Sequence, residues 1–187
     1  MLTDTHCHLA DPALARRLPE ITATAHATGV QRFIVPSVTE ADFDAVRRLH
    51  APPEYYGALG LHPWFAESFQ PGLINHIAER LQAQPGLLVG EIGLDFFAPA
   101  LAAPPWRERQ QALFRQQLKL ARRHGLPVIL HSRHAVDAVL RHLRETGPHT
   151  GIAHAFSGSE QQARAFIELG FKLGFGGACT FERATRL

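Results

Sequence analysis

Short apolar segments alternate with longer helical patterns along the 187-residue chain, and this alternation most restricts the folds available to it. The apolar segments predict seven strands, at Leu2–His6, Arg32–Pro36, Tyr56–Leu61, Leu87–Ile92, Pro127–His131, Gly151–His154 and Phe171–Gly176. Six helices are predicted between them, at Pro12–Thr28, Glu40–His50, Leu73–Gln84, Arg107–His124, Ala135–Thr146 and Glu160–Leu169. Strands that alternate with single helices predict a parallel sheet, either an open doubly wound sheet or a (β/α)8 barrel.

Two helix boundaries carry specific signals. Gly125 follows a run of basic residues that suits the negative end of a helix dipole, so the helix Arg107–His124 is expected to end there. Ser159 and Gln162 have the spacing of a capping box and predict the start of another helix. The Pro-rich segment Ala98–Pro105 is expected to be a long loop between a strand and a helix.

Composition excludes several classes of protein. Nineteen basic and 17 acidic residues give a net charge of +2, too little for a protein that binds nucleic acid by charge alone. Cys7 and Cys179 do not form a disulfide framework, and the N-terminus has no signal-peptide pattern. We therefore expect a single-domain, cytoplasmic protein with no membrane segment. The 12 histidines are unusual, because histidine is generally scarce and is the commonest metal ligand.

Polar residues that can bind metal follow five of the predicted strands. His6 and His8 are two positions apart at the end of the first, so both imidazoles are expected on one face. Glu91, His131 and His154 end later strands, and His62 follows another; in parallel α/β folds the strand carboxyl ends form the active site. Any one of these residues alone could be a loop histidine or a cap. Their recurrence favours a site.

Two histidines from the first strand, one carboxylate and two further histidines predict a site for two divalent metal ions. Glu91 is the expected bridging ligand and the expected catalytic residue. Such ions lie roughly 3.5–4 Å apart and activate a water for hydrolysis. Imidazole-rich ligation suits Zn, Mn, Fe, Co or Ni better than Mg.

Five ordered segments resemble the motifs of the TatD family of metal-dependent hydrolases, within the amidohydrolase superfamily. They are Thr5–His8 (THCH), Gly60–Pro63 (GLHP), Gly90–Asp95 (GEIGLD), Pro127–Arg133 (PVILHSR) and His154–Ser159 (HAFSGS). The resemblance implies a TIM barrel in which His6 and His8 bind one metal, Glu91 bridges, and His131 and His154 bind the second. It also implies hydrolysis of DNA phosphodiesters, typically as a 3′–5′ exonuclease; some members are associated with editing of D-aminoacyl-tRNA.

The chain departs from the family pattern in two places. His134 follows His-Ser-Arg, where the family often has Asp. A metal-binding aspartate on strand eight, the family's expected base for the attacking water, has no counterpart before the last residue, Leu187. Because such barrels typically need ~250 residues, residues 1–187 are expected to form one barrel domain truncated at its C-terminus, without strand eight and the last helices. The unclosed edge could then support self-association.

Further residues have open alternatives. His62 is expected to contact substrate, or else its loop is simply capped; Arg133 could hold a phosphate or form a salt bridge. Asp95 could contact substrate, orient a ligand or cap its loop. Ser159 could help receive a phosphate at its helix start. Six remaining histidines are expected to be solvated: His26, His50, His76, His124, His142 and His149.

Three functional hypotheses follow. The first is a metal-dependent hydrolase that cleaves DNA phosphodiesters at strand ends. The second keeps the metal centre but acts on a small ester, amide or phosphotriester, or on D-aminoacyl-tRNA, since one fold supports many such chemistries. The third is a catalytically impaired fragment or binding protein that lacks the strand-eight aspartate.

Overall fold

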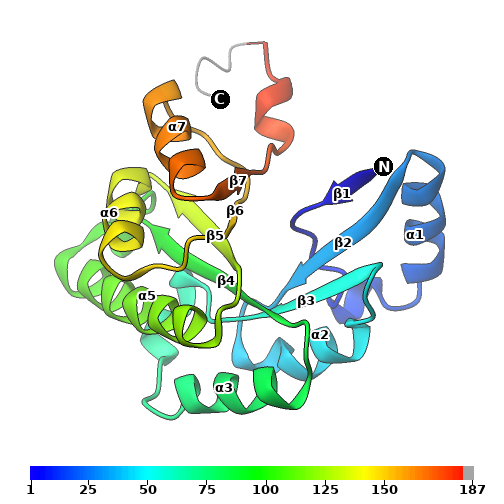
Figure 1. The fold of residues 1–187 in the computed structure, drawn as a ribbon, viewed down its shortest axis with the longest axis horizontal. Helices are drawn as coiled ribbons and strands as arrows, with labels where there is room; N and C mark the ends of the chain where they lie inside the picture. Colours follow the sequence, from blue (N-terminus) through cyan, green and yellow to red (C-terminus); the bar gives the residue numbers. More distant parts are fainter. Residues whose placement is uncertain (183–187) are drawn as a thin grey trace.

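The computed structural model describes residues 1–182, which contain one seven-stranded parallel sheet. Its strands are β1 (Leu2–Asp4), β2 (Val30–Pro36), β3 (Tyr55–Leu59), β4 (Leu88–Asp95), β5 (Val128–Arg133), β6 (Gly151–Ala153) and β7 (Phe171–Leu173). They pair in sequence order from β1 to β7. This order confirms the barrel type of sheet, because a doubly wound sheet reverses its strand order part-way. Figure 1 shows the sheet curled, with β1 and β7 at its edges.

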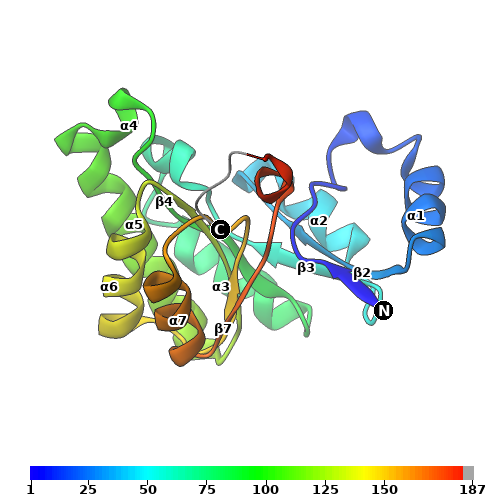
Figure 2. The ribbon, with the colours of Figure 1, turned by 90° about the horizontal axis from the view of Figure 1, so that it is seen from above.

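Helices cover the outer, convex side of the curled sheet (Figures 1 and 2). The α-helices are α1 (Leu18–Ala27), α2 (Phe43–Leu49), α3 (Leu73–Ala83), α4 (Pro99–Ala102), α5 (Pro104–His124), α6 (Val136–Thr146) and α7 (Glu160–Glu168). Short 3-10 helices are η1 (Pro12–Leu14), η2 (Glu40–Asp42), η3 (Pro63–Ser68) and η4 (Gly177–Thr180). Two predicted helix boundaries are confirmed. Helix α5 ends at Gly125, which adopts a left-handed conformation, and α7 begins after Ser159, which forms the capping box with Gln162.

Three predicted segments form other elements than expected, and several strand ends also differ: the strand predicted over Phe171–Gly176 ends at Leu173, and that over Leu87–Ile92 extends to Asp95. The helix predicted over Pro12–Thr28 is divided into η1 and α1, and that over Glu40–His50 into η2 and α2. The expected loop Ala98–Pro105 instead holds α4 and the start of α5. Proline explains the last difference, because Pro99 and Pro104 occupy the first position of each helix, where a missing N–H costs nothing.

The sheet is buried on both faces in its central strands. Val128 and Leu130 on β5 belong to the large core between sheet and helices, while Ile129 belongs to a smaller cluster with Ile34 and Ala58. Because neighbouring residues on a strand point to opposite faces, β5 has apolar packing on both sides, as expected for a parallel sheet.

Two glycines let β4 lie close to β5 where the register shifts between Val89 and Ile92. Gly90 and Gly93 have φ angles of 157° and 150°, in the region that favours glycine. A Cβ atom at Gly93 would collide with the backbone carbonyl of His131. The close approach brings Glu91, between the two glycines, next to His131 of β5 and His154, which follows β6.

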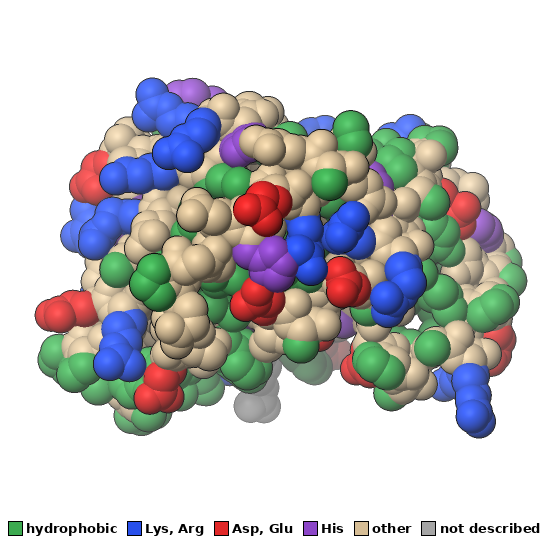
Figure 3. Space-filling model, turned by 90° about the horizontal axis from the view of Figure 1, so that it is seen from below, with side chains coloured by type: hydrophobic (Ala, Val, Ile, Leu, Met, Phe, Trp, Pro, Cys, Tyr) green, Lys and Arg blue, Asp and Glu red, His purple; other side chains and the backbone are tan. Residues whose placement is uncertain are grey.

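The outer helical face carries both signs of charge, and Figure 3 shows acidic, basic and histidine side chains side by side there. Glu40 pairs with His76, and Asp44 lies 3.3 Å from Arg80. The prediction that His142 is solvated was wrong: it is 2% exposed, because it lies on the inward face of α6, where Leu143 is also buried. Among residues 1–182, no helix is both long and apolar enough to span a membrane.

Candidate metal centre

Glu91 is the central residue of the site. It was expected at the end of a strand, but β4 continues to Asp95, so Glu91 lies within the strand and is 2% exposed. A carboxylate this deeply buried must have partners that compensate its lost hydration. Its two oxygens meet this need with two different groups of imidazoles.

Oε2 of Glu91 faces the histidines that follow β1. The Nε2 atoms of His6 and His8 lie 2.8 and 4.0 Å from it. The strand geometry assumed for this pair was wrong, because β1 ends at Asp4, whose side chain accepts a hydrogen bond from the backbone N–H of His6. Both imidazoles nevertheless point to the same carboxylate oxygen, and the Cys7 thiol between them turns away to the carbonyl of Ile34. Burial raises the pKa of the Cys7 thiol, which disfavours a thiolate ligand.

Oε1 of Glu91 faces three histidines that lie within β5, directly after β6 and after β3. His131 Nδ1 lies 2.9 Å from it, His154 Nε2 2.7 Å and His62 Nε2 3.5 Å. His131 lies within β5, and His154 immediately follows β6. The rings of His6 and His154 stack at 3.8 Å, so the two groups of imidazoles are adjacent.

Charge interactions keep Glu91 ionised in this cluster. Burial alone would raise its pKa, but hydrogen bonds from His131, His154 and His6 outweigh burial and hold the pKa well below the usual value. Burial would also lower the pKa of His131, yet Asp95 and Glu91 raise it to about 9. Burial dominates at His154 and His8, whose pKa values are lowered. Neutral imidazoles are the form that binds metal.

Asp95 holds His131 from the side opposite Glu91. Its carboxylate is 1% exposed, and Oδ2 lies 3.1 Å from His131 Nε2 and accepts a 2.7 Å hydrogen bond from Trp64 Nε1. Oδ1 accepts from the backbone N–H of Phe97 at 2.9 Å. Burial would raise the Asp95 pKa, but His131, Phe97 and Trp64 lower it to about 2. Because Asp95 accepts at Nε2, the Nδ1 lone pair of His131 is directed at the centre. Asp95 thus orients a candidate ligand and caps its own loop, and its buried carboxylate is not arranged to contact substrate.

His62 is buried beside the centre at the start of η3. Its Nδ1 accepts a hydrogen bond from the backbone N–H of Trp64 at 3.2 Å. A neutral imidazole that accepts at Nδ1 carries its proton on Nε2, the atom that faces Glu91. His62 is therefore arranged as a hydrogen-bond donor. Its ring nitrogen nevertheless lies within 4.8 Å of donor atoms of Glu91 and His131, so by position it could also serve as a metal ligand.

The donor set matches what a divalent transition metal requires. His6, His8 and Glu91 offer one group of donor atoms within 4.8 Å of one another, and His62, Glu91 and His131 offer another. His154 Nε2 adds a further nitrogen 3.4 Å from His131 Nδ1. Imidazoles with one carboxylate are typical ligands of Zn, Mn, Fe, Co and Ni.

Two supporting residues were missed in the sequence. Gln110 and Gln117 on α5 are fully buried. Gln110 accepts a hydrogen bond from the backbone N–H of Asp95, and Gln117 bonds both the N–H and the carbonyl of Leu61, next to His62. Amides seven residues apart on the apolar face of a helix were the available signal, since such groups must find partners when buried.

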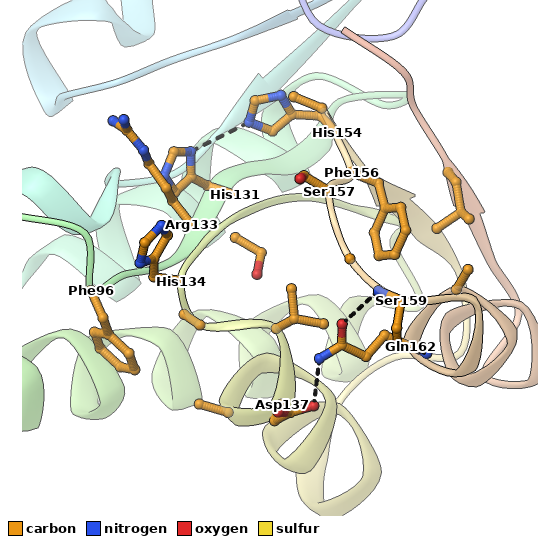
Figure 4. Close-up of a pocket in the computed structure, with 18 of the residues that line it drawn as sticks. Phe96, His131, Arg133, His134, Asp137, His154, Phe156, Ser157, Ser159 and Gln162 are labelled. Carbon is orange, nitrogen blue, oxygen red and sulfur yellow. Dashed lines mark hydrogen bonds between the residues drawn. The ribbon is translucent and has the colours of Figure 1, made fainter. Parts of the chain in front are cut away.

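A cavity of about 1470 Å³ lies next to His131 and His154 (Figure 4). It is lined by the residues just after β4, the loops after β5 and β6, and the starts of α6 and α7, including the N-cap residue Ser159. Arg133 lines it and has no carboxylate partner within the described residues, so the alternative of a salt bridge is not realised there. His134, which replaces the family's Asp, lines the same cavity and packs edge-on against Phe97.

Parallel strands of a barrel-type sheet with histidines and carboxylates gathered at the strand ends are the arrangement of metal-dependent hydrolases. This chain is a metal-dependent hydrolase of the TatD family, because residues 3–187 match the family described as TatD related DNase.

Known relatives agree with this assignment. The chain is 42% identical to the uncharacterized metal-dependent hydrolase YjjV of Escherichia coli K12, over 98% of this chain and 71% of that protein. The crystal structure of YjjV matches with a TM-score of 0.88 at 41% identity, covering 98% of this chain and 71% of that one. A human protein named Deoxyribonuclease TATDN3 is 28% identical over 91% of this chain and 66% of its own length.

Proposed function

We propose that this chain hydrolyses phosphodiester bonds at the end of a DNA strand, as a 3′–5′ exonuclease. The observation that carries the proposal is the division of the Glu91 carboxylate between two groups of imidazoles. This division supports a two-metal centre, with His6 and His8 on one ion, His131 and His154 on the other, and Glu91 between them. Two bound divalent ions supply an activated water and neutralise charge on the phosphate.

The surrounding residues have separate tasks in this proposal. Asp95 fixes the ring of His131 and its tautomer, and is thus a positioning residue. His62 donates from Nε2 to a phosphate oxygen, in keeping with its Nδ1 contact to the Trp64 N–H, which leaves the proton on Nε2. Arg133 lies over the ring of Phe97 with no competing carboxylate among residues 1–182, so its guanidinium is available to hold the phosphate.

The test uses short DNA oligomers labelled at either end, with Mn, Zn, Co, Ni, Fe or Mg added in turn. We expect stepwise removal of nucleotides from the 3′ end, more active with a metal that prefers imidazole than with Mg, and no activity with excess EDTA. His131→Ala is expected to abolish cleavage, because it removes a ligand. His149→Ala, which changes an exposed histidine outside the centre, serves as the matched control and should keep full activity.

The competing substrates are tested in the same preparation. A panel of nitrophenyl esters, small amides and D-aminoacyl-tRNA is assayed beside the oligomers. Hydrolysis of a member of this panel with no cleavage of DNA would refute the nuclease proposal while leaving the metal centre intact. Cleavage of DNA that survives His131→Ala would refute the site assignment.

A further inference from the structure

Two arginines of the cavity beside the centre lie over the rings of two phenylalanines that are adjacent in sequence. The guanidinium carbon of Arg133 lies 3.6 Å from the ring centre of Phe97, and that of Arg107 lies 4.3 Å from the ring centre of Phe96. All four residues line the cavity. We call Arg107, Arg133, Phe96 and Phe97 the Arg–Phe wall.

Within residues 1–182, the guanidiniums of the wall have no polar partners, whereas each acidic side chain of the cavity has one. Neither guanidinium of the wall has a carboxylate within 4.0 Å or a side-chain hydrogen bond in the described part of the chain. Asp137 accepts a 2.8 Å hydrogen bond from Gln162, drawn in Figure 4, and Glu160 pairs with Arg164 at 2.6 Å. The cavity, which His131 and His154 also line, therefore offers two guanidiniums that are unpaired among the described residues.

Stacking prepares these arginines for an anion. A guanidinium over an aromatic ring gains a cation–π attraction and loses conformational freedom, while its N–H groups stay available at the edge. Those N–H groups form a planar fork that matches a phosphate, which Lys cannot reproduce. One phosphate at the centre accounts for Arg133 only. Arg107 remains without a role.

We propose that Arg107 binds a second phosphate of the same nucleic-acid strand, adjacent to the scissile phosphate held beside Arg133. The ligand class is thus a strand with at least two phosphodiesters. The inference rests on the proposed function, since it assumes that a phosphodiester binds at the centre. It adds a requirement on substrate length that the centre alone does not impose.

The test compares thymidine dinucleotide, which has one phosphodiester, with the trinucleotide, which has two. Arg107→Ala should lower kcat/KM for the trinucleotide by about 10-fold or more, the value of a charge-assisted hydrogen bond, and change that for the dinucleotide by less than about 2-fold. Arg107→Lys should recover only part of the loss. Arg109→Ala is the matched control: Arg109 lies on the same helix and stacks on Trp106, but it does not line the cavity.

Binding is measured separately from cleavage. Fluorescence anisotropy of a labelled phosphorothioate trinucleotide is followed against salt concentration. Loss of one phosphate contact should reduce the slope of log K against log salt by about 0.7 in Arg107→Ala and leave it unchanged in Arg109→Ala.

Equal losses on the two substrates, or equal losses in the two Ala variants, would overturn the second-phosphate site. If the wild-type chain cleaves no phosphodiester, the proposed function fails, and anisotropy still decides the inference. If Arg107→Ala binds the trinucleotide more weakly than wild type and Arg109→Ala does not, the second-phosphate site is supported. Indistinguishable binding in Arg107→Ala and Arg109→Ala refutes it.

Discussion

Asp95→Asn tests how the centre is held together, because it keeps the side-chain shape and removes only the charge and one acceptor. The carboxylate now accepts from Trp64 and His131 on one oxygen and from the Phe97 N–H on the other. An amide has a single acceptor oxygen, so in its better orientation its NH2 group faces the Phe97 N–H. That buried donor is left unpaired at a cost of about 1–3 kcal/mol.

The two contacts that remain also weaken, since each changes from a charged to a neutral acceptor at a cost of about 1 kcal/mol. Together these changes predict a loss of about 3–5 kcal/mol in the free energy of unfolding. Trp64→Phe is the matched control, because it removes one donor and leaves the carboxylate bonded to His131; we expect a loss of about 1 kcal/mol.

Urea unfolding in the presence of EDTA, from pH 5 to pH 8, measures both losses without metal. The Asp95 pKa of about 2 lies below its usual value, so its stabilisation is present above about pH 4 and is lost as pH falls toward 2. The titration of Asp95 itself therefore adds no pH dependence across the assay range, but the wild-type advantage over Asp95→Asn should shrink as pH rises above about 6.5, because Asp95 is a main cause of the raised pKa of His131. Under the proposed ligand assignment, zinc affinity should also fall by about 10- to 100-fold. The reasoning fails if Asp95→Asn is within about 1 kcal/mol of wild type, or if Trp64→Phe matches it.

Three further predictions concern stability. Gly93→Ala should cost more than about 3 kcal/mol in urea unfolding or prevent folding, because the new Cβ would collide with the backbone of His131. Gly125→Ala, where the Cβ meets open space, should cost about 1 kcal/mol, and equal effects would contradict the close-approach argument. The free energy of unfolding of the metal-free protein should fall by up to about 3 kcal/mol as pH rises from 6.5 to 9. The reason is that the pKa of His131 is raised to about 9 on folding, so its stabilisation is complete below pH 6.5 and absent above 9; an unchanged urea midpoint would rule this out. Gln117→Leu should cost about 2–4 kcal/mol, since it leaves the buried backbone N–H and carbonyl of Leu61 unpaired. Gln116→Leu, on the exposed side of α5, should cost almost nothing, and similar thermal midpoints for the two variants would contradict the prediction.

The family resemblance predicted the barrel, which the apolar patterns alone left open. Periodicity predicted the order of elements and a parallel sheet, because both depend on local patterns of apolar residues. It misplaced Glu91 relative to its strand, since Gly90 and Gly93 interrupt the apolar pattern while the backbone of β4 continues to Asp95. Close approach of two strands is a tertiary property, and sequence spacing does not report it.

The same limit applies to individual histidines. His62 and His142 were both interpreted from their local surroundings, one as a strand-end residue and the other as a residue of a helix surface. Both are buried in the structure: His62 lies against Glu91, and His142, on the inward face of α6, lies against Phe114 of α5. What decides each position is the neighbour that covers it, and that neighbour is distant in sequence.

Helix α5 shows how the missing information is nevertheless encoded. Gln110 and Gln117 are seven residues apart, close to two helical turns, so both amides face the sheet. One holds the backbone of Asp95, which orients His131, and the other holds the backbone just before His62. Because both amides lie on one rigid helix, the segments on either side of Glu91 keep a fixed separation. Residues that touch no ligand thus set the geometry on which the proposed centre depends.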